Sequence, residues 1–335
     1  MFIFFTLSLG LLAATFLAPN KQTLAFILSF IVLFILFAFR GIEVGTDTIN
    51  YAYYFDSYYD SEWMRSAMEP GWVLVNDIAS YFGWGYRGVM VISSLLCLLP
   101  IYYAASKHSK NAMLVILLYF LFYYYLRSFN ITRQFVAVGF GLLSIISFLN
   151  RRNICFLLYL FIAFLFHKSA LVLLFLYSIR FIPSQFIIYA LLIAATFVVG
   201  LFGPTVLYKL ISLTPYAKYL LNYEYGNFLG NAAAGLLLNS YYLIALYYGK
   251  NLEKENKVFL LFVLIFNVTI RLPFANRLLL YFSIYQIIYF TYVLNEIKNV
   301  ENRMFFYIMT IVAAYFVFFR SFGAGGIFPY SNILI

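Results

Sequence analysis

The sequence predicts an all-α fold, a polytopic integral membrane helix bundle with about 12 transmembrane helices. Of its 335 residues, 65% are hydrophobic and only 10% are charged, and the mean hydropathy is +0.91. A soluble domain carries roughly 25% charged residues, so this chain requires lipid as its solvent. Apolar runs long enough to cross a bilayer, about 17–25 residues each, recur along the whole length.

No soluble linker, low-complexity stretch or internal repeat interrupts the sequence, which predicts a single membrane domain over residues 1–335. The first apolar run lacks a basic leader and a small-residue cleavage site, so we expect a retained helix there. The expected spans are 2–18, 22–39, 86–106, 112–128, 132–149, 153–166, 169–180, 185–202, 236–249, 258–272, 276–294 and 304–320.

Basic residues in the short connections predict the orientation. The positive-inside rule places Lys107–Lys110, Arg151–Arg152 and Lys250–Lys257 in the cytoplasm. Both termini and two long loops, 40–85 and 203–235, are then expected outside. The net charge of +10 does not indicate a nucleic acid partner, because the basic residues are dispersed at helix ends rather than gathered in one patch.

This topology leaves half of the 22 lysines and arginines at the outer face, where positive charge does not help orientation. The inner set is mostly lysine, whereas the outer set is mostly arginine. Because a guanidinium binds oxyanions at two points, the outer set predicts a site for a phosphate-bearing substrate, with lipid-headgroup anchoring as the alternative. The outer arginines are Arg40, Arg65, Arg87, Arg127, Arg133, Arg271, Arg277 and Arg320.

The first outer loop carries candidate acid–base groups. It begins Arg40-Gly-Ile-Glu-Val-Gly-Thr-Asp-Thr-Ile-Asn-Tyr51. Asp47 is a candidate base for activating a sugar hydroxyl, and a helix N-cap is its alternative role. Glu69-Pro-Gly-Trp72 follows, and the stretch 72–83 is too short to span, so it is expected in the interface or as a re-entrant segment. The tryptophans of this region suit an aromatic belt or stacking on sugars.

Two further motifs lie at expected helix ends. Arg127-Ser-Phe-Asn-Ile-Thr-Arg-Gln134 is a tight outer turn that places Arg133 in the first turn of the next helix, where the helix N-terminus adds positive potential. Phe166-His167-Lys168-Ser169 separates two apolar halves of about 13 residues, which predicts a broken helix that lines a wet cavity. His167 can donate to a sugar or phosphate oxygen, transfer a proton or join two helices, and Ser169 can cap the second half.

The last outer turn, Arg271-Leu-Pro-Phe-Ala-Asn-Arg277, again places arginines at two helix ends. Tyr281 follows Arg277 by one helical turn, on the same face. Cys97 and Cys155 both lie in apolar runs and are expected to be small core residues rather than a disulfide. With only two histidines and no Cys/His cluster, we predict no metal site and no cofactor.

These motifs together resemble the EpsG-like or Wzy-like family of exopolysaccharide and O-antigen polymerases. The resemblance extends from about residue 30 to 290 and does not include the C-terminal residues 320–335. The matching pieces are Arg40…Gly45-Thr46-Asp47…Asn50-Tyr51, Glu69-Pro70-Gly71, Arg133-Gln134, Phe166-His167-Lys168-Ser169-Ala170-Leu171 and Asn276-Arg277…Tyr281.

The resemblance implies a multi-pass glycosyltransferase of the bacterial inner membrane, with its active site facing the periplasm. Such an enzyme joins oligosaccharide repeat units carried on undecaprenyl pyrophosphate, by metal-independent glycosyl transfer, into O-antigen, capsule or exopolysaccharide. The implied partners are the lipid-linked oligosaccharide and the bilayer, with a chain-length regulator and a flippase as further candidates.

Within this reading, Asp47 is the expected base, Arg133 and Arg277 are pyrophosphate clamps, and His167 lies beside the leaving phosphate. The expected catalytic residues are Asp47, His167 and Arg133; the expected substrate-binding residues are Arg40, Glu69, Arg127, Gln134, Lys168, Arg271, Arg277 and Tyr281.

A lipid-linked oligosaccharide flippase is the main alternative, and it predicts two related halves with charge on both sides of a cavity. The unexplained charge here gathers at the outer face, which favours chemistry there. An O-antigen ligase would use the same donor with another acceptor. A membrane acyltransferase is less favoured, because His167 has no acidic partner nearby in the sequence.

Overall fold

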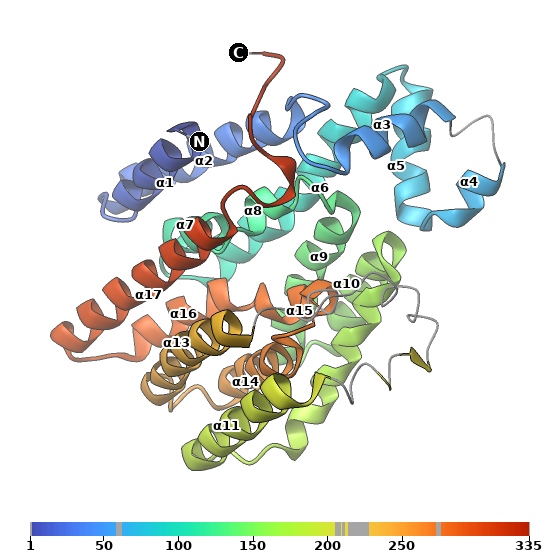
Figure 1. Ribbon diagram of the computed structural model, residues 1–335. Helices are drawn as coiled ribbons and strands as arrows, with labels where there is room; N and C mark the ends of the chain where they lie inside the picture. Colours follow the sequence, from blue (N-terminus) through green and yellow to red (C-terminus); the bar gives the residue numbers. More distant parts are fainter. Residues whose placement is uncertain are drawn as a thin grey trace. The chain divides into compact units, whose positions relative to one another are not determined.

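A computed structural model describes residues 2–57, 62–204, 209, 212–213, 228–272 and 276–334. These residues form helices joined by short connections (Figure 1). The α-helices are α1 (Phe2–Ala14), α2 (Pro19–Ala38), α3 (Thr48–Ser57), α4 (Glu62–Ala67), α5 (Pro70–Tyr81), α6 (Gly85–His108), α7 (Ala112–Leu121), α8 (Tyr124–Arg127), α9 (Thr132–Leu149), α10 (Asn153–Phe166), α11 (Phe186–Phe202), α13 (Phe228–Tyr248), α14 (Glu253–Thr269), α15 (Asn276–Ser283), α16 (Gln286–Glu296) and α17 (Val300–Ser321). The same described part of the chain also contains the 3₁₀ helices η1 (Lys168–Phe181) and η4 (Ala324–Gly326).

The chain is a polytopic helical membrane protein, as its composition predicts. Among the described residues, five helical segments are long and apolar enough to span a bilayer: Lys21–Ala38, Gly85–His108, Thr132–Leu149, Arg277–Glu296 and Val300–Ser321. Shorter apolar helices account for most of the other expected spans: Phe2–Ala14, Ala112–Leu121, Asn153–Phe166 and Phe186–Phe202. The number of about 12 spans stays a prediction.

Several expected spans are interrupted or shifted. The span expected at 112–128 ends as α7 near Tyr123, whose left-handed backbone (φ 66°) turns the chain into α8. The segment expected at 169–180 is the 3₁₀ helix η1 rather than an α-helix. In the outer loop expected at 203–235, residues 228–235 are instead the start of α13, whereas Tyr216 to Tyr225 lie outside the described residues.

The reason for the early start of α13 lies in its small residues. The hydropathy of the stretch 231–235, which is Asn231, three alanines and Gly235, is too low for an expected span. Alanine is nevertheless the best helix former. Gly235 packs so closely that a Cβ there would overlap the side chains of Phe197 and Ile270. A small residue at such a contact lets helices approach one another within the membrane.

The chain forms two compact units, Met1–Leu173 with Ala314–Ile335, and Leu174–Ala313. The single domain over 1–335 stays a prediction. In the first unit, α6 packs against α2, α5 and α9, and α9 packs against α10. Gly139 of α9 faces Pro100 of α6, and the Cys97 thiol lies 3.7 Å from the Thr132 carbonyl oxygen. These contacts hold the N-terminal end of α9, with Arg133, against α6.

The second unit contains a buried polar network between its helices. Asn267 of α14 accepts from the Asn239 amide at 2.8 Å and donates to the Ile193 carbonyl at 3.0 Å. The Tyr289 hydroxyl donates to Asn256 Oδ1 at 2.6 Å, and its ring stacks on Phe259 with centroids 4.1 Å apart. Hydrogen bonds of this kind join apolar helices where lipid provides no hydrophobic drive for association.

Candidate functional site

Arg40 is fully buried directly after α2. Its guanidinium donates to the carbonyl oxygens of Phe37 at 2.7 Å and Phe129 at 3.1 Å and to Thr48 Oγ1 at 3.3 Å. It also lies over the Phe37 and Phe129 rings. Burial lowers the pKa of Arg40 to about 10, which leaves the group charged at neutral pH. Because protein groups take these donors, the geometry favours a structural role, and substrate binding by Arg40 stays a prediction.

Asp47 stands at the start of α3, half-buried, and Thr46 connects it to the turn before α9. The Thr46 N–H donates to Asn130 Oδ1 at 2.7 Å, and its hydroxyl donates to the same oxygen at 3.1 Å. That hydroxyl also lies 3.5 Å from Asp47 Oδ1. In the described part of the chain, no backbone N–H donates to the Asp47 carboxylate, so this structure does not use it as a helix cap.

Arg133 lies in the first turn of α9 and forms an ion pair with Glu69. Arg133 Nη1 is 2.7 Å from Glu69 Oε2, with the arginine side chain 28% and the glutamate side chain 14% exposed. Glu69 precedes α5, and its side chain makes no cap hydrogen bond there. The carboxylate therefore orients the guanidinium at the N-terminal end of α9, where the helix dipole adds positive potential.

Tyr51 and Tyr54 of α3 are buried and lie close enough to this ion pair to feel the charge of Arg133. The Tyr51 ring contacts the Trp72 ring with centroids 5.0 Å apart, and its hydroxyl donates to the Asn130 carbonyl at 3.0 Å. Burial raises the pKa of Tyr51, although the charge of Arg133 opposes this, and burial raises that of Tyr54 to about 12. Both phenols are therefore protonated donors at neutral pH.

Trp72 differs from the expected interfacial role. It is fully buried and its indole packs on Tyr51, so it is available neither to a lipid belt nor to a sugar face. Trp84, in contrast, is 52% exposed and remains compatible with a belt.

The Glu69-Pro70-Gly71 motif lies against the Phe166-His167 motif. A Cβ on Gly71 would lie 2.9 Å from the Leu165 carbonyl oxygen and 3.0 Å from the Phe166 ring, so only glycine lets α5 approach the end of α10 this closely. α10 ends at Phe166, and the backbone of the next residue, His167, is extended. The break expected at this position is therefore present.

His167, rather than Ser169, supplies the side-chain acceptor at this break. The Ser169 N–H points to His167 Nδ1 at 3.4 Å, and the Ser169 hydroxyl lies 2.6 Å from the same nitrogen. A backbone N–H can only donate, so Nδ1 acts as the acceptor and the neutral ring carries its proton on Nε2. His167 is half-buried.

Four sequence motifs thus meet in the first unit, and we call their assembly the four-motif cluster. Its members are Thr46–Asp47, Glu69–Gly71, Asn130–Arg133 and Phe166–His167. Near it, Arg127 is half-buried, Gln134 is buried and Lys168 is exposed. Their roles in substrate binding stay predictions.

The remaining candidates belong to the second unit. Arg271 donates to the Leu201 carbonyl at 2.8 Å, which satisfies a carbonyl in the last turn of α11. Arg277 is exposed and Tyr281 is fully buried, both on α15. The substrate-binding roles of these three residues stay predictions.

Asn130 is the residue that sequence reasoning missed. Asn130, Ile131 and Thr132 match the short pattern of a glycosylation acceptor, and this pattern does not indicate a role for Asn130 in the fold. In the structure, its side chain and carbonyl together accept from Thr46 and Tyr51, which joins the first loop to α9. Polar side chains just before helices are common, so the sequence does not indicate that Asn130 joins these two segments.

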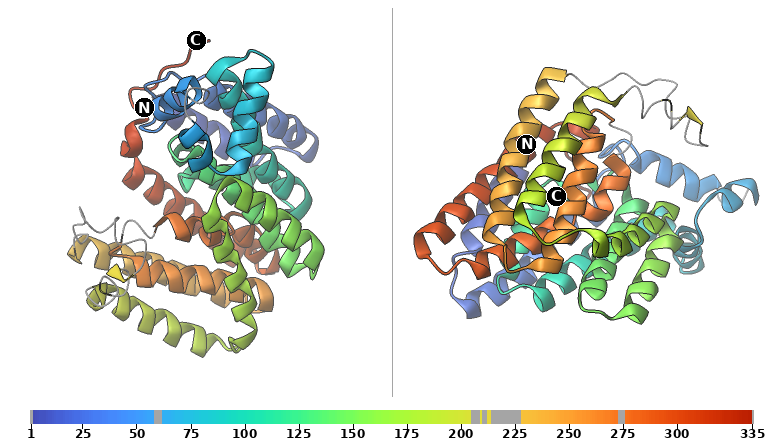
Figure 2. Two further views of the ribbon diagram at one scale, coloured as in Figure 1. Left: turned by 90° about the vertical axis from the view of Figure 1, so that its right-hand side faces the viewer. Right: turned by 90° about the horizontal axis from the view of Figure 1, so that it is seen from below.

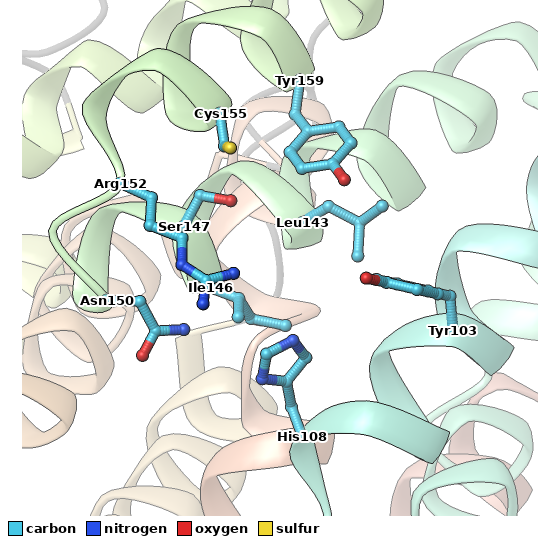
Figure 3. Close-up of a pocket in the computed structure, with 9 residues that line it drawn as sticks. All are labelled: Tyr103, His108, Leu143, Ile146, Ser147, Asn150, Arg152, Cys155 and Tyr159. Carbon is cyan, nitrogen blue, oxygen red and sulfur yellow. The ribbon is translucent and has the colours of Figure 1, made fainter.

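A shallow pocket of about 40 Å³ lies at the opposite end of α6 and α9 (Figure 3). α9 has 18 residues, about 27 Å of helix, so this pocket is distinct from the four-motif cluster. None of the predicted site residues lines it. Its lining residues are Tyr103, His108, Leu143, Ile146, Ser147, Asn150, Arg152, Cys155 and Tyr159.

The sequence model of the EpsG family matches residues 23–332. The chain belongs to the EpsG family. This match includes every motif of the cluster and continues through most of the C-terminal segment, which the motif resemblance did not cover. No curated protein and no solved structure matches the chain. The protein is thus an EpsG-family membrane protein, of the membrane polysaccharide polymerase type.

The close approach at Gly71 gives a testable consequence for this EpsG-family protein. Gly71→Ala should separate α5 from α10 and lower the free energy of unfolding by about 1–3 kcal/mol, as overpacking typically does. The measurement is the thermal unfolding midpoint of the purified protein in detergent. Gly10→Ala is the matched control, because Gly10 is also helical and a Cβ there meets nothing within 4 Å. An unchanged midpoint for Gly71→Ala would contradict the packing.

Proposed function

We propose that this protein polymerises oligosaccharide repeat units carried on undecaprenyl pyrophosphate, at the outer face of the bacterial inner membrane. The observation that carries the proposal is the four-motif cluster, in which a guanidinium at a helix N-terminus and a carboxylate without a cap role belong to one assembly. Membership of the EpsG family supports the same reaction class.

The proposed reaction is a glycosyl transfer. The acceptor hydroxyl oxygen bonds to the anomeric carbon of the donor while the bond from that carbon to the pyrophosphate oxygen breaks. Asp47 takes the proton of the acceptor hydroxyl. The pyrophosphate leaves with the bonding electron pair, and its developing charge is stabilised by Arg133 and the N–H groups of the first turn of α9. His167 donates from Nε2 to a phosphate oxygen.

Glu69 and Asp47 are both carboxylates of the cluster, and their surroundings favour different roles. Glu69 is engaged by Arg133 at 2.7 Å, whereas the Asp47 carboxylate has a 3.5 Å contact with the Thr46 hydroxyl. The Glu69 carboxylate is occupied by the guanidinium, whereas the Asp47 carboxylate makes only the longer contact, so Asp47 is the better candidate for proton transfer. Glu69 then orients the guanidinium, which retains further N–H donors for phosphate.

A deletion strain tests this function against its alternatives. We expect the strain to carry a single repeat unit on its final acceptor in place of the polymer ladder, and to regain the ladder when complemented. A flippase deletion would leave no repeat unit on the acceptor, and a ligase deletion would leave polymer that is not transferred. Either of these two outcomes would refute the polymerase assignment. The readout is an electrophoretic ladder of the surface polysaccharide.

A further inference from the structure

The C-terminal segment after α17 returns to the loop that follows α2 (Figures 1 and 2). The Gly41 N–H donates to the Ser331 carbonyl at 3.0 Å, and the Ile333 N–H donates to the Phe39 carbonyl at 3.0 Å. Arg40 and Asn332 form an antiparallel bridge between these two bonds. Two chain segments far apart in sequence are therefore paired by backbone hydrogen bonds.

Side chains of this segment also close the C-terminal end of α2. The Tyr330 hydroxyl donates to the Leu36 carbonyl at 2.7 Å, and the Asn332 amide donates to the Ile35 carbonyl at 3.3 Å. Both carbonyls belong to the last turn of α2, where helices leave some acceptors without partners. The Ile35 carbonyl also accepts from the Phe39 N–H at 3.1 Å. The Tyr330 ring contacts the Phe4 ring at 5.0 Å between centroids. The segment is therefore an integral part of the first unit.

The turn at Gly325 and Gly326 reaches the cluster itself. The Gly45 N–H donates to the Gly326 carbonyl at 2.9 Å, and the Thr46 N–H donates to the Gly325 carbonyl at 3.1 Å as well as to Asn130. Gly325 has φ +80°, and a Cβ there would overlap the Asn130 amide nitrogen. Only glycine thus allows the turn, Asn130 and Thr46 to meet at this point.

We infer that the Gly325–Gly326 turn and Asn130 are a positioning device that holds Thr46 and thereby places the Asp47 carboxylate for reaction. The inference rests on the proposed function of Asp47. Thr46 is held through its N–H by both the turn and Asn130, and through its hydroxyl by Asn130. Asp47 follows Thr46 directly, so a shift of Thr46 displaces the carboxylate. Misplacement of a reacting group by about 1 Å can lower a rate about 100-fold.

Gly325→Ala tests the device, with Gly323→Ala as the matched control. Both glycines have positive φ, +80° and +88°, so the backbone strain is comparable, but a Cβ at Gly323 meets nothing within 4 Å. The assay uses purified full-length protein and the lipid-linked repeat unit that the deletion strain accumulates. We expect Gly325→Ala to lose about 100-fold in kcat with KM unchanged, and Gly323→Ala to retain kcat. Equal kcat for the two variants would overturn the inference.

A double-mutant cycle identifies Asn130 as the point of contact. In an Asn130→Ala background the overlapping amide is gone, so Gly325→Ala should cause no further loss of kcat. Full additivity of the two losses would overturn the inference. If the Gly325→Ala protein does not accumulate in cells, variants of Asn130 alone provide the test. Asn130→Ala should have a lower kcat than the wild type. Asn130→Asp keeps the acceptor oxygen for Thr46, so it should retain most of the wild-type kcat. Full kcat in Asn130→Ala would overturn the inference.

The same assay separates this inference from the proposed function. If the polymerase assignment fails, the wild-type protein forms no polymer from the lipid-linked repeat unit. If only the positioning role fails, the wild-type protein polymerises normally and Gly325→Ala behaves like Gly323→Ala. A merely structural role for the turn would lower the thermal unfolding midpoint and the amount of protein without lowering kcat per folded molecule.

Discussion

Asp47→Asn should leave a membrane-inserted, folded protein with almost no polymerase activity. Asparagine keeps a side-chain oxygen that can accept from the Thr46 hydroxyl, the contact Asp47 makes in the structure. It cannot take a proton from the acceptor hydroxyl at useful strength. Loss of a general base typically lowers a rate about 100- to 10,000-fold. The measurement is polymer ladder length in a complemented deletion strain, with protein level checked by immunoblot.

Asp56→Asn is the matched control for this change. Asp56 lies on the same helix, α3, and is exposed, so its loss should leave the ladder unchanged. Asp60, which the sequence also assigns to the solvated loop, lies outside the described residues. A full-length ladder from Asp47→Asn would contradict the assignment of Asp47 as the base, and Glu69 and His167 would then be the next candidates. Loss of the Asp47→Asn protein itself would show a structural role instead.

Arg133→Lys should strongly impair polymerisation although it keeps the positive charge. Lysine can still pair with Glu69, which is 2.7 Å from Arg133 Nη1, but it lacks the planar fork that contacts two phosphate oxygens at once. Removing one preorganised donor from a transition state typically costs about 2.7–4 kcal/mol, which corresponds to about 100- to 1,000-fold in kcat. The assay is again the ladder, supported by kcat with the lipid-linked repeat unit.

Arg65→Lys is the corresponding control, because Arg65 also pairs with a carboxylate in the same region. Its partner Asp77 lies at 3.1 Å, and the two side chains are 53% and 35% exposed. Exposed ion pairs contribute about 0–1 kcal/mol, so this change should be mild in both stability and activity. A normal ladder from Arg133→Lys at matched protein level would reduce Arg133 to a structural or headgroup-anchoring role.

The helices of this protein could be predicted closely because hydropathy is a local property. The ends of α9 and α10 coincide with the expected spans 132–149 and 153–166, since each helix is a mostly apolar run with polar or basic residues at its ends. The errors occur where packing overrides local composition. Gly235 is a residue type typical of loops, but in the structure it lies in a helix and packs against neighbouring side chains. Tyr123 adopts a left-handed backbone and so divides an apolar run that was expected to be one helix.

The candidate site could be predicted in its residue types but not in its connections. Arginines and carboxylates at expected helix ends favour an anion site, with lipid-headgroup anchoring as the alternative, because charged residues are rare in so apolar a chain. That Arg133 pairs with Glu69, and that Gly71 touches the end of α10, depends on how distant helices pack. Arg40 resembles the other arginines in sequence, yet its donors are taken by the backbone carbonyls of Phe37, in the last turn of α2, and of Phe129.

The sequence by itself determined that this EpsG-family chain is a helical membrane protein with arginines and carboxylates at its helix ends, because composition and charge are read residue by residue. Only the tertiary structure decided which of those residues meet. In the structure, Trp72 and Arg40 are buried, and Asn130 accepts a hydrogen bond from Thr46. Gly325 contacts the loop that carries Asp47. Contacts between residues tens to hundreds of positions apart leave no local pattern, since they depend on the packing of whole helices rather than on the neighbours of any one residue.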